Sequence, residues 1–196
     1  MKTTQRHFQT ALVASLLLAV IVLPSRAADV RGLARLGADF GGDTLVVGPF
    51  TTGTSAKIKA NEGVYLGGGM SILNDAKKLS LDLAATWKYT SIEAVNQTFE
   101  FTRFPLEVLG FYHFSDAEGV RIGGGLSYQL NPKFKADGNL SNGTVNFDNA
   151  AGYVIKIDYT RKHLNFGARY TAAKYEISGA QAATGNGPGL FVGGVF

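Results

Sequence analysis

The sequence predicts an all-β protein, an eight-stranded antiparallel up-and-down transmembrane β-barrel, preceded by a cleaved helical signal peptide. Three observations predict it. Apolar and polar residues alternate almost throughout the chain after residue 30, the connections alternate between tight and longer, and no later segment is apolar enough for a transmembrane helix. Alternation at a period of two is typical of strands with one apolar face. Such strands can cross a membrane if they close into a barrel.

The first element is an N-terminal targeting segment. Two basic residues are followed by an apolar run from Ala11 to Leu23 and then by small residues up to Ala27. This order is typical of a secretory signal peptide. The run falls short of the about 20 apolar residues that a spanning helix needs. We therefore predict a signal peptide at 1–27, cleaved after Ala27 or alternatively after Ala28, and a barrel domain at 28–196.

Cleavage changes the charge of the chain. The formal charge is +4, but Lys2, Arg6 and Arg26 leave with the signal peptide and no acid leaves, so the mature chain carries +1. A chain this close to neutral gives no reason to expect nucleic-acid binding. The chain has no cysteine, which excludes a disulfide framework and a thiolate metal site. We expect no cofactor.

The clearest strand runs from Leu79 to Tyr89. Its leucines fall on one face together with Trp87, whereas Asp82 and Lys88 fall on the other. A helix would scatter these charges among the leucines, so the pattern favours a strand. Seven further segments alternate in the same way and bring the strands to eight: 34–40, 64–72, 104–113, 120–129, 151–159, 164–171 and 190–196.

The connections between these strands predict the topology. Tight connections lie at 74–78, 115–119 and 161–163, and longer ones at 41–63, 93–97, 131–144 and 178–187. Outer-membrane barrels have short periplasmic turns and longer outer loops. With both termini periplasmic, every tight connection falls inside and every longer one outside. A soluble sandwich gives no reason for this alternation.

The first outer connection contains a pattern of its own. Thr44 to Phe50 and Ser55 to Ala60 alternate around Thr51 to Thr54, which predicts a hairpin. Gly41, Gly42 and Gly63 are expected at bulges beside it.

Aromatic residues on the apolar face gather toward the two ends of the predicted strands. Two such belts are expected where a barrel meets the two membrane interfaces. The alternative is a soluble sandwich whose core uses strand-favouring aromatics. The outer belt would contain Trp87, Tyr89, Tyr128 and Tyr170, and the inner belt Phe114, Tyr159 and Phe196.

The segment from Arg31 to Phe196 resembles the small outer-membrane β-barrel superfamily that includes the OmpA membrane domain, OmpX and OmpW. The most specific feature is the last strand, where Leu190, Val192 and Phe196 look like the signal read by the barrel assembly machinery, although Gly194 departs from the large residue often found there. The resemblance implies a porin-like monomer in the outer membrane of a Gram-negative bacterium, in contact with lipid and lipopolysaccharide. A shared fold does not establish a function.

The face opposite the lipid side carries charged residues. An eight-stranded barrel has an interior just wide enough for side chains, and buried charges need partners, so we expect a plug of ion pairs. The alternative is a narrow polar path or a ligand pocket near the outer mouth, for which the inward glycines Gly67, Gly69, Gly123 and Gly125 would leave space unless they only relieve crowding. The expected charge network comprises Arg35, Asp39, Asp82, Lys88, Glu107, His113, Arg121, Lys156, Asp158 and Arg169.

Enzymatic functions find little support in the sequence. Outside the signal peptide the only histidines are His113 and His163, and neither has a serine at a suitable strand spacing for a lipid-modifying enzyme. Two histidines without cysteine also make a poor metal site. The sequence favours a non-enzymatic barrel with a structural, envelope-integrity or surface-interaction role. The alternatives are a narrow OmpW-like channel or carrier for small, including hydrophobic, molecules and, third, an outer-membrane lipid enzyme.

Overall fold

The computed structural model describes residues 29–49, 55–115, 118–139 and 142–196. Regular structure in these ranges is entirely β-strand, and no helix within them is long and apolar enough to cross a membrane. The predicted signal peptide, its cleavage site and the hairpin turn at 51–54 lie outside the described residues.

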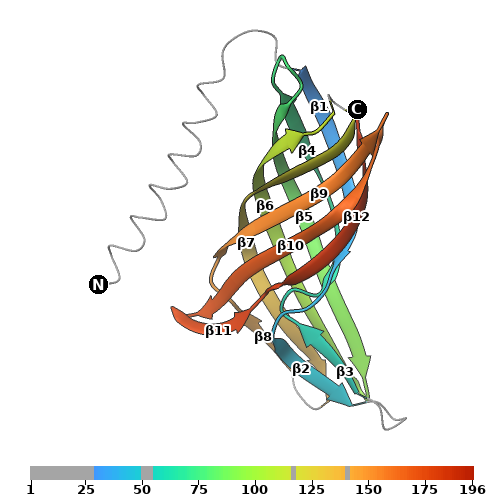
Figure 1. The fold of residues 1–196 in the computed structure, drawn as a ribbon. Helices are drawn as coiled ribbons and strands as arrows, with labels where there is room; N and C mark the ends of the chain where they lie inside the picture. Colours follow the sequence, from blue (N-terminus) through green and yellow to red (C-terminus); the bar gives the residue numbers. More distant parts are fainter. Residues whose placement is uncertain (1–28, 50–54, 116–117, 140–141) are drawn as a thin grey trace.

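Eight strands close into a barrel (Figure 1). Each pairs antiparallel with two neighbours, and the ring closes where the last strand pairs with the first, from Leu33 opposite Val195 to Asp39 opposite Gly189. The predicted fold class is confirmed. In order around the ring, the strands are β1 (Asp29–Asp39), β4 (Gly63–Leu73), β5 (Leu79–Ala94), β6 (Gln97–His113), β7 (Gly119–Gly138), β9 (Ala150–Arg161), β10 (Leu164–Ile177) and β12 (Gly187–Val195).

The barrel strands place apolar side chains outside and polar side chains inside. On β9 the alternation is strict: Tyr153 and Ile155 are 69% and 61% exposed, whereas Lys156 and Asp158 are buried. Water-soluble proteins rarely expose large contiguous apolar surface. Lipid is the medium that matches an apolar exterior around a polar interior.

Four short strands gather at the end of the barrel opposite the C-terminus (Figure 1). β2 and β3 form the hairpin predicted in the first outer connection, as a two-stranded sheet of their own. β8 extends the sheet beside β7, and β11 extends it beside β10. The tight turns and the C-terminus lie at the other, inner end. The bounds are β2 (Thr44–Pro49), β3 (Ser55–Lys59), β8 (Gly143–Asn146) and β11 (Ala180–Thr184).

Two predicted outer connections are shorter than expected, because the strands beside them are longer. Segment 93–97 contains only a turn at Val95 and Asn96, which β5 and β6 reach as strands of 16 and 17 residues. Asn96 has a φ of 55°, the left-handed conformation that tight hairpin turns use. Segment 131–144 likewise begins inside β7, which continues past Pro132. The sequence analysis therefore assigned the charged residues of these two segments to loops, whereas in the structure they belong to strands that continue beyond the membrane.

The outer end holds a buried apolar cluster, which we call the outer cap. The rings of Phe101 and Tyr175 meet edge to face at its centre, with 5.8 Å between centroids. The β2–β3 hairpin contributes Ile58, which is fully buried, so the hairpin is packed into the cap. The cap consists of Ile58, Ala60, Phe101, Ala150, Ala173, Tyr175 and Ala183.

Candidate functional site

The charged interior of the barrel is the candidate functional site. Its predicted members come from six of the eight barrel strands, and the structure brings them into one continuous core. Each is at most 6% exposed: Arg35, Asp39, Asp82, Lys88, Glu107, His113, Arg121, Lys156, Asp158 and Arg169.

The inner group of charges centres on Asp82. Its Oδ2 accepts hydrogen bonds from Nη2 of Arg35 at 2.5 Å and from Nη2 of Arg121 at 3.1 Å. Its Oδ1 accepts a further one from the Ser71 hydroxyl at 2.6 Å. Arg121 also donates through Nε to Asp158 at 2.6 Å. Two guanidinium groups and two carboxylates therefore neutralise one another.

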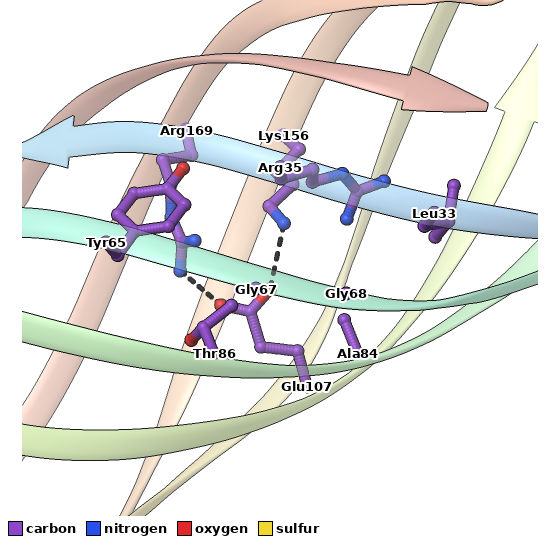
Figure 2. A pocket seen from close by; sticks show the side chains of 10 residues that line it. All are labelled: Leu33, Arg35, Tyr65, Gly67, Gly68, Ala84, Thr86, Glu107, Lys156 and Arg169. Carbon is purple, nitrogen blue, oxygen red and sulfur yellow. Dashed lines mark hydrogen bonds and ion pairs between the residues drawn. The ribbon is translucent and has the colours of Figure 1, made fainter.

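The outer group of charges centres on Glu107 and Asp39. Figure 2 shows Glu107 approached by Lys156 and Arg169, which donate to its two carboxylate oxygens at 2.8 and 2.5 Å. Asp39 accepts a hydrogen bond from Nζ of Lys88 at 2.5 Å and lies 3.7 Å from Nε of Arg169. Arg169 thus links the two carboxylates.

Arg103 is a buried cation that the sequence analysis missed. It is 1% exposed, and its guanidinium carbon lies 4.4 Å from the centroid of the Phe101 ring. Its Nη2 donates to the main-chain carbonyl of Glu62 at 2.9 Å. Arg103 shares the inward parity of Glu107 on β6, but the predicted strand began at Phe104. Extending the alternation by one residue identifies it.

Aromatic rings cover several of the buried guanidinium groups. The guanidinium of Arg121 lies 4.0 Å from the centroid of Phe111, and that of Arg169 lies 5.1 Å from the centroid of Tyr65. These distances suit cation–π attraction. A side chain at Gly123 would strike the Phe111 ring. This glycine therefore relieves crowding and leaves no passage.

The described side chains border two cavities of about 10 Å³ each. Each has room for about one water molecule. Tyr65 and Arg169 border both cavities. The first, drawn in Figure 2, also contacts Arg35, Glu107 and Lys156. The second also contacts Asp39, Asn61, Thr86, Lys88, Pro105, Gln129 and Thr171.

His113 has a serine neighbour, so the sequence-based statement that it lacks one is wrong. Nε2 of His113 lies 2.8 Å from the Ser80 hydroxyl oxygen, across the pairing of β5 and β6. Spacing along one strand could not reveal a contact made between strands. Both side chains are buried in the interior, away from the lipid-facing outer surface where a deacylase would work. In the described ranges, no group of three or more His, Cys, Asp or Glu could hold a metal ion.

The structure exposes most of the predicted interface aromatics on the barrel exterior. Tyr89 is only half-buried; its ring stacks on Trp87 at 5.6 Å and its hydroxyl donates to Glu100 at 2.9 Å. The remaining members are 38–69% exposed: Trp87, Tyr128, Tyr170, Phe114, Tyr159 and Phe196.

The predicted assembly signal lies on the closing strand. Leu190 and Val192 are exposed on the exterior of β12. Just beyond it, the main chain of Phe196 exchanges hydrogen bonds with Gly32, at 2.5 and 3.1 Å. Whether this strand is read during assembly stays a prediction.

The fold is similar to that of solved outer-membrane proteins, although no family model and no curated protein matches the sequence. Ail, the attachment invasion locus protein of Yersinia pestis, aligns with a TM-score of 0.58 and 11% identity, over 86% of this chain and 99% of that chain. Its complex with the heparin analogue sucrose octasulfate gives the same score and identity, over 87% and 99%. The N-terminal barrel domain of OprF from Pseudomonas aeruginosa aligns at 0.44 and 14%, over 87% and 100%.

At these identities the similarity concerns the fold, and at that level the predicted resemblance is confirmed. The closed ring of eight strands and the apolar exterior agree with it. This chain therefore has the fold of the small eight-stranded outer-membrane β-barrels.

Proposed function

We propose that this protein is a non-enzymatic outer-membrane barrel with a closed interior, which acts through its outer surface in envelope integrity or in contact with the surroundings. The observation that carries the proposal is the filled interior. Ion pairs occupy the barrel at membrane level, and the outer cap lies above them.

Opening this interior would be costly. A path through the barrel would have to separate Glu107 from Lys156 and Arg169, or Asp82 from its two arginines, while all remain buried. Removing one partner from a buried ion pair typically costs about 3–5 kcal/mol. At the outer end, a path would also have to displace Ile58 from the outer cap.

The outer end offers surface for contacts beyond the membrane. All four residues of β8 are exposed, and among the described strands only β7 pairs with it, which leaves its other edge available for hydrogen bonding. Ail, which shares the fold, is named for attachment and invasion. Both observations support the surface-contact version of the proposal.

The proposed partners follow from the exterior. The apolar band would contact lipid and, in the outer leaflet, lipopolysaccharide, and the barrel assembly machinery would insert the chain. Because the ring closes within one chain, the barrel needs no second copy to satisfy its strand edges, which supports a monomer.

Planar-bilayer recording tests the closed interior. We expect no reproducible open state from the refolded wild-type barrel. A stable conductance that changes in Lys156→Met or Arg121→Met would replace the proposal with the narrow-channel alternative. Incubation with lipid A tests the enzymatic alternative, and turnover abolished by His113→Ala would overturn the non-enzymatic assignment.

A replacement of the outer surface tests the positive part of the proposal. Exchanging 143–146 for a glycine-serine linker removes β8 and leaves the interior residues in place. We expect reduced growth under envelope stress or reduced adherence of cells carrying this variant at wild-type barrel levels. Wild-type behaviour in both assays would contradict a role for this edge.

A further inference from the structure

The described part of the barrel interior contains more buried positive than negative charge. Six cationic side chains and four carboxylates are each at most 6% exposed. A buried charge without a counter-charge is strongly unfavourable, because neither water nor a partner replaces its hydration. The excess of two positive charges therefore requires compensation. The cations are Arg35, Lys88, Arg103, Arg121, Lys156 and Arg169, and the acids are Asp39, Asp82, Glu107 and Asp158.

The excess lies entirely in the outer half of the interior. The inner group is balanced, since two arginines face two aspartates. In the outer half, Lys88, Arg103, Lys156 and Arg169 share only two carboxylates. Lys88 and Arg103 stand directly opposite each other in the register of β5 and β6. Nε and Nη1 of Arg103 have no hydrogen-bond partner among the described residues.

A cavity lies beside this excess charge. It is the second of the two cavities, bordered by Lys88, Arg169, Thr171, Gln129 and Tyr65. These side chains carry hydrogen-bond donors of ammonium, guanidinium, hydroxyl and amide type. The Tyr65 hydroxyl is buried and has no hydrogen-bond partner of ordinary geometry among the described residues.

We propose that this cavity binds one small inorganic anion of the size of chloride. The anion would accept hydrogen bonds from the Tyr65 hydroxyl and from Lys88, and it would neutralise part of the excess charge. Asp39 also borders the cavity and repels an anion, but its carboxylate is bonded to Lys88 and lies near Arg169. Arg103 does not border the cavity, but it lies opposite Lys88 in the strand register, and with this third cation nearby the local sum of charge stays positive.

The size of the cavity restricts the ligand. A volume of about 10 Å³ accepts a single particle of about the size of water. Chloride is somewhat larger than water and fits this cavity after a small outward shift of its lining; bromide is slightly larger again, whereas gluconate is far too large. The competing way to remove the excess charge is the loss of a proton from a buried lysine, which would need no anion.

Unfolding of the refolded barrel in lipid tests the proposal. Sodium chloride is exchanged for sodium gluconate at constant ionic strength, so that screening of surface charge is unchanged. A site in the folded state lowers the unfolding equilibrium constant up to tenfold for each tenfold rise in chloride. We expect this dependence in the wild type. Equal stability in both salts would overturn the proposal in favour of a neutral lysine.

A variant pair locates the effect. Tyr65→Phe keeps the ring over Arg169 but removes the unpartnered hydroxyl, and we expect it to weaken the chloride dependence several-fold. Lys135→Met removes an exposed lysine on the exterior and should retain it in full. Bromide-soaked crystals supply an independent readout. An anomalous peak in the cavity supports the site, and its absence from the cavity contradicts it.

Discussion

At the scale of single residues, Asp82 shows how this barrel tolerates charge inside a membrane. Its side chain is fully buried, yet two arginines and the Ser71 hydroxyl bond to its two oxygens. Buried charges are tolerated only when partners replace the hydration they lose. The surrounding strands hold these partners at fixed positions, so the ion pairs and the strand register depend on each other.

Asp82→Asn tests this dependence. The change leaves the Arg35 guanidinium without a carboxylate partner, so we expect a loss of about 3–5 kcal/mol of folding free energy. The matched control is Asp29→Asn, which breaks a partly exposed pair with Arg31 and should cost about 1 kcal/mol or less. Urea unfolding in lipid vesicles measures both. Similar losses in the two variants would refute a structural role for the inner group.

Leu83→Arg tests the inside–outside assignment of β5. Leu83 lies on the exterior midway between Leu79 at the inner end and Trp87 in the outer belt, so an arginine there would enter the middle of the bilayer. We expect a cost of about 2–4 kcal/mol. The neighbouring Ala84→Ser faces the first cavity and should be mild. The same unfolding assay applies, and equal costs at the two positions would mean that the faces are wrongly assigned.

The residue scale also shows where sequence reasoning stops. Parity along a strand places Glu107 and Lys156 inside, but it cannot tell that their side chains meet, because the contact depends on how the ring closes. The Ser80–His113 contact was missed for the same reason. Arg103 was missed because its strand was predicted too short. The members of the site were largely predictable; their pairing was not.

At the scale of elements, the β2–β3 hairpin differs from the barrel strands. In the described part of the chain it forms no ladder with them and is held by the outer cap and by a few loop hydrogen bonds. The main-chain amide of Asp43 donates to the Thr184 carbonyl at 2.8 Å, and that of Ala60 donates to the Asp43 carbonyl at 2.8 Å. Elements with so few attachments open at lower free energy than the core of a fold. The hairpin should therefore open locally while the barrel stays closed.

Ile58→Asp tests local opening. A carboxylate at this fully buried position cannot remain in the outer cap, so we expect the hairpin to detach and the Ala60 amide to exchange its hydrogen much faster. Val47→Asp changes a half-exposed residue of the same hairpin and should leave exchange nearly unchanged. Hydrogen exchange provides the readout, and the unfolding midpoint of the barrel should be similar in both variants. Equal exchange rates in the two variants would show that Ile58 does not anchor the hairpin.

The contact between Asp43 and Thr184 predicts a pH response at the same element. The main-chain amide and the hydroxyl of Thr184 donate to the Asp43 carboxylate at 2.7 and 2.8 Å, and these bonds lower the pKa of Asp43. A carboxyl group whose pKa is lower in the folded state stabilises the fold at pH values above its ordinary pKa of about 4. This stabilisation is lost as the pH falls through the lowered folded-state pKa. Below that value we expect the Thr184 amide resonance to shift and its protection to fall. Asp43→Asn should abolish this titration; an unchanged titration would assign it to another group.

At the scale of the whole molecule, the fold was more predictable than its outer extension. Period-two alternation and alternating connection lengths determine the number, direction and facing of the barrel strands, because a closed ring in lipid permits few other arrangements. Outside the membrane this constraint is absent. There, Glu93 and Lys133 lie on strands, although charged residues of this kind are equally common in loops. The outer cap brings together residues from five strands and the connections beside them, so no local sequence pattern predicts it.

Phe196 lies where the ring closes and is also the last residue of the predicted assembly signal. The Phe196 ring covers Gly32 and lies beside Gly194, next to the seam where β12 meets β1, and remains 69% exposed. Because lipid replaces most contacts of an exposed ring, Phe196→Ala should refold in vesicles with nearly wild-type stability. If the C-terminal strand is the assembly signal, the same variant should reach the outer membrane of cells in markedly smaller amounts. Leu164→Ala, on the neighbouring strand β10 and also exposed, should affect neither measurement. Equal cellular levels of the two variants would show that Phe196 is not needed for assembly. Its role would then be limited to packing beside the pairing of β12 and β1.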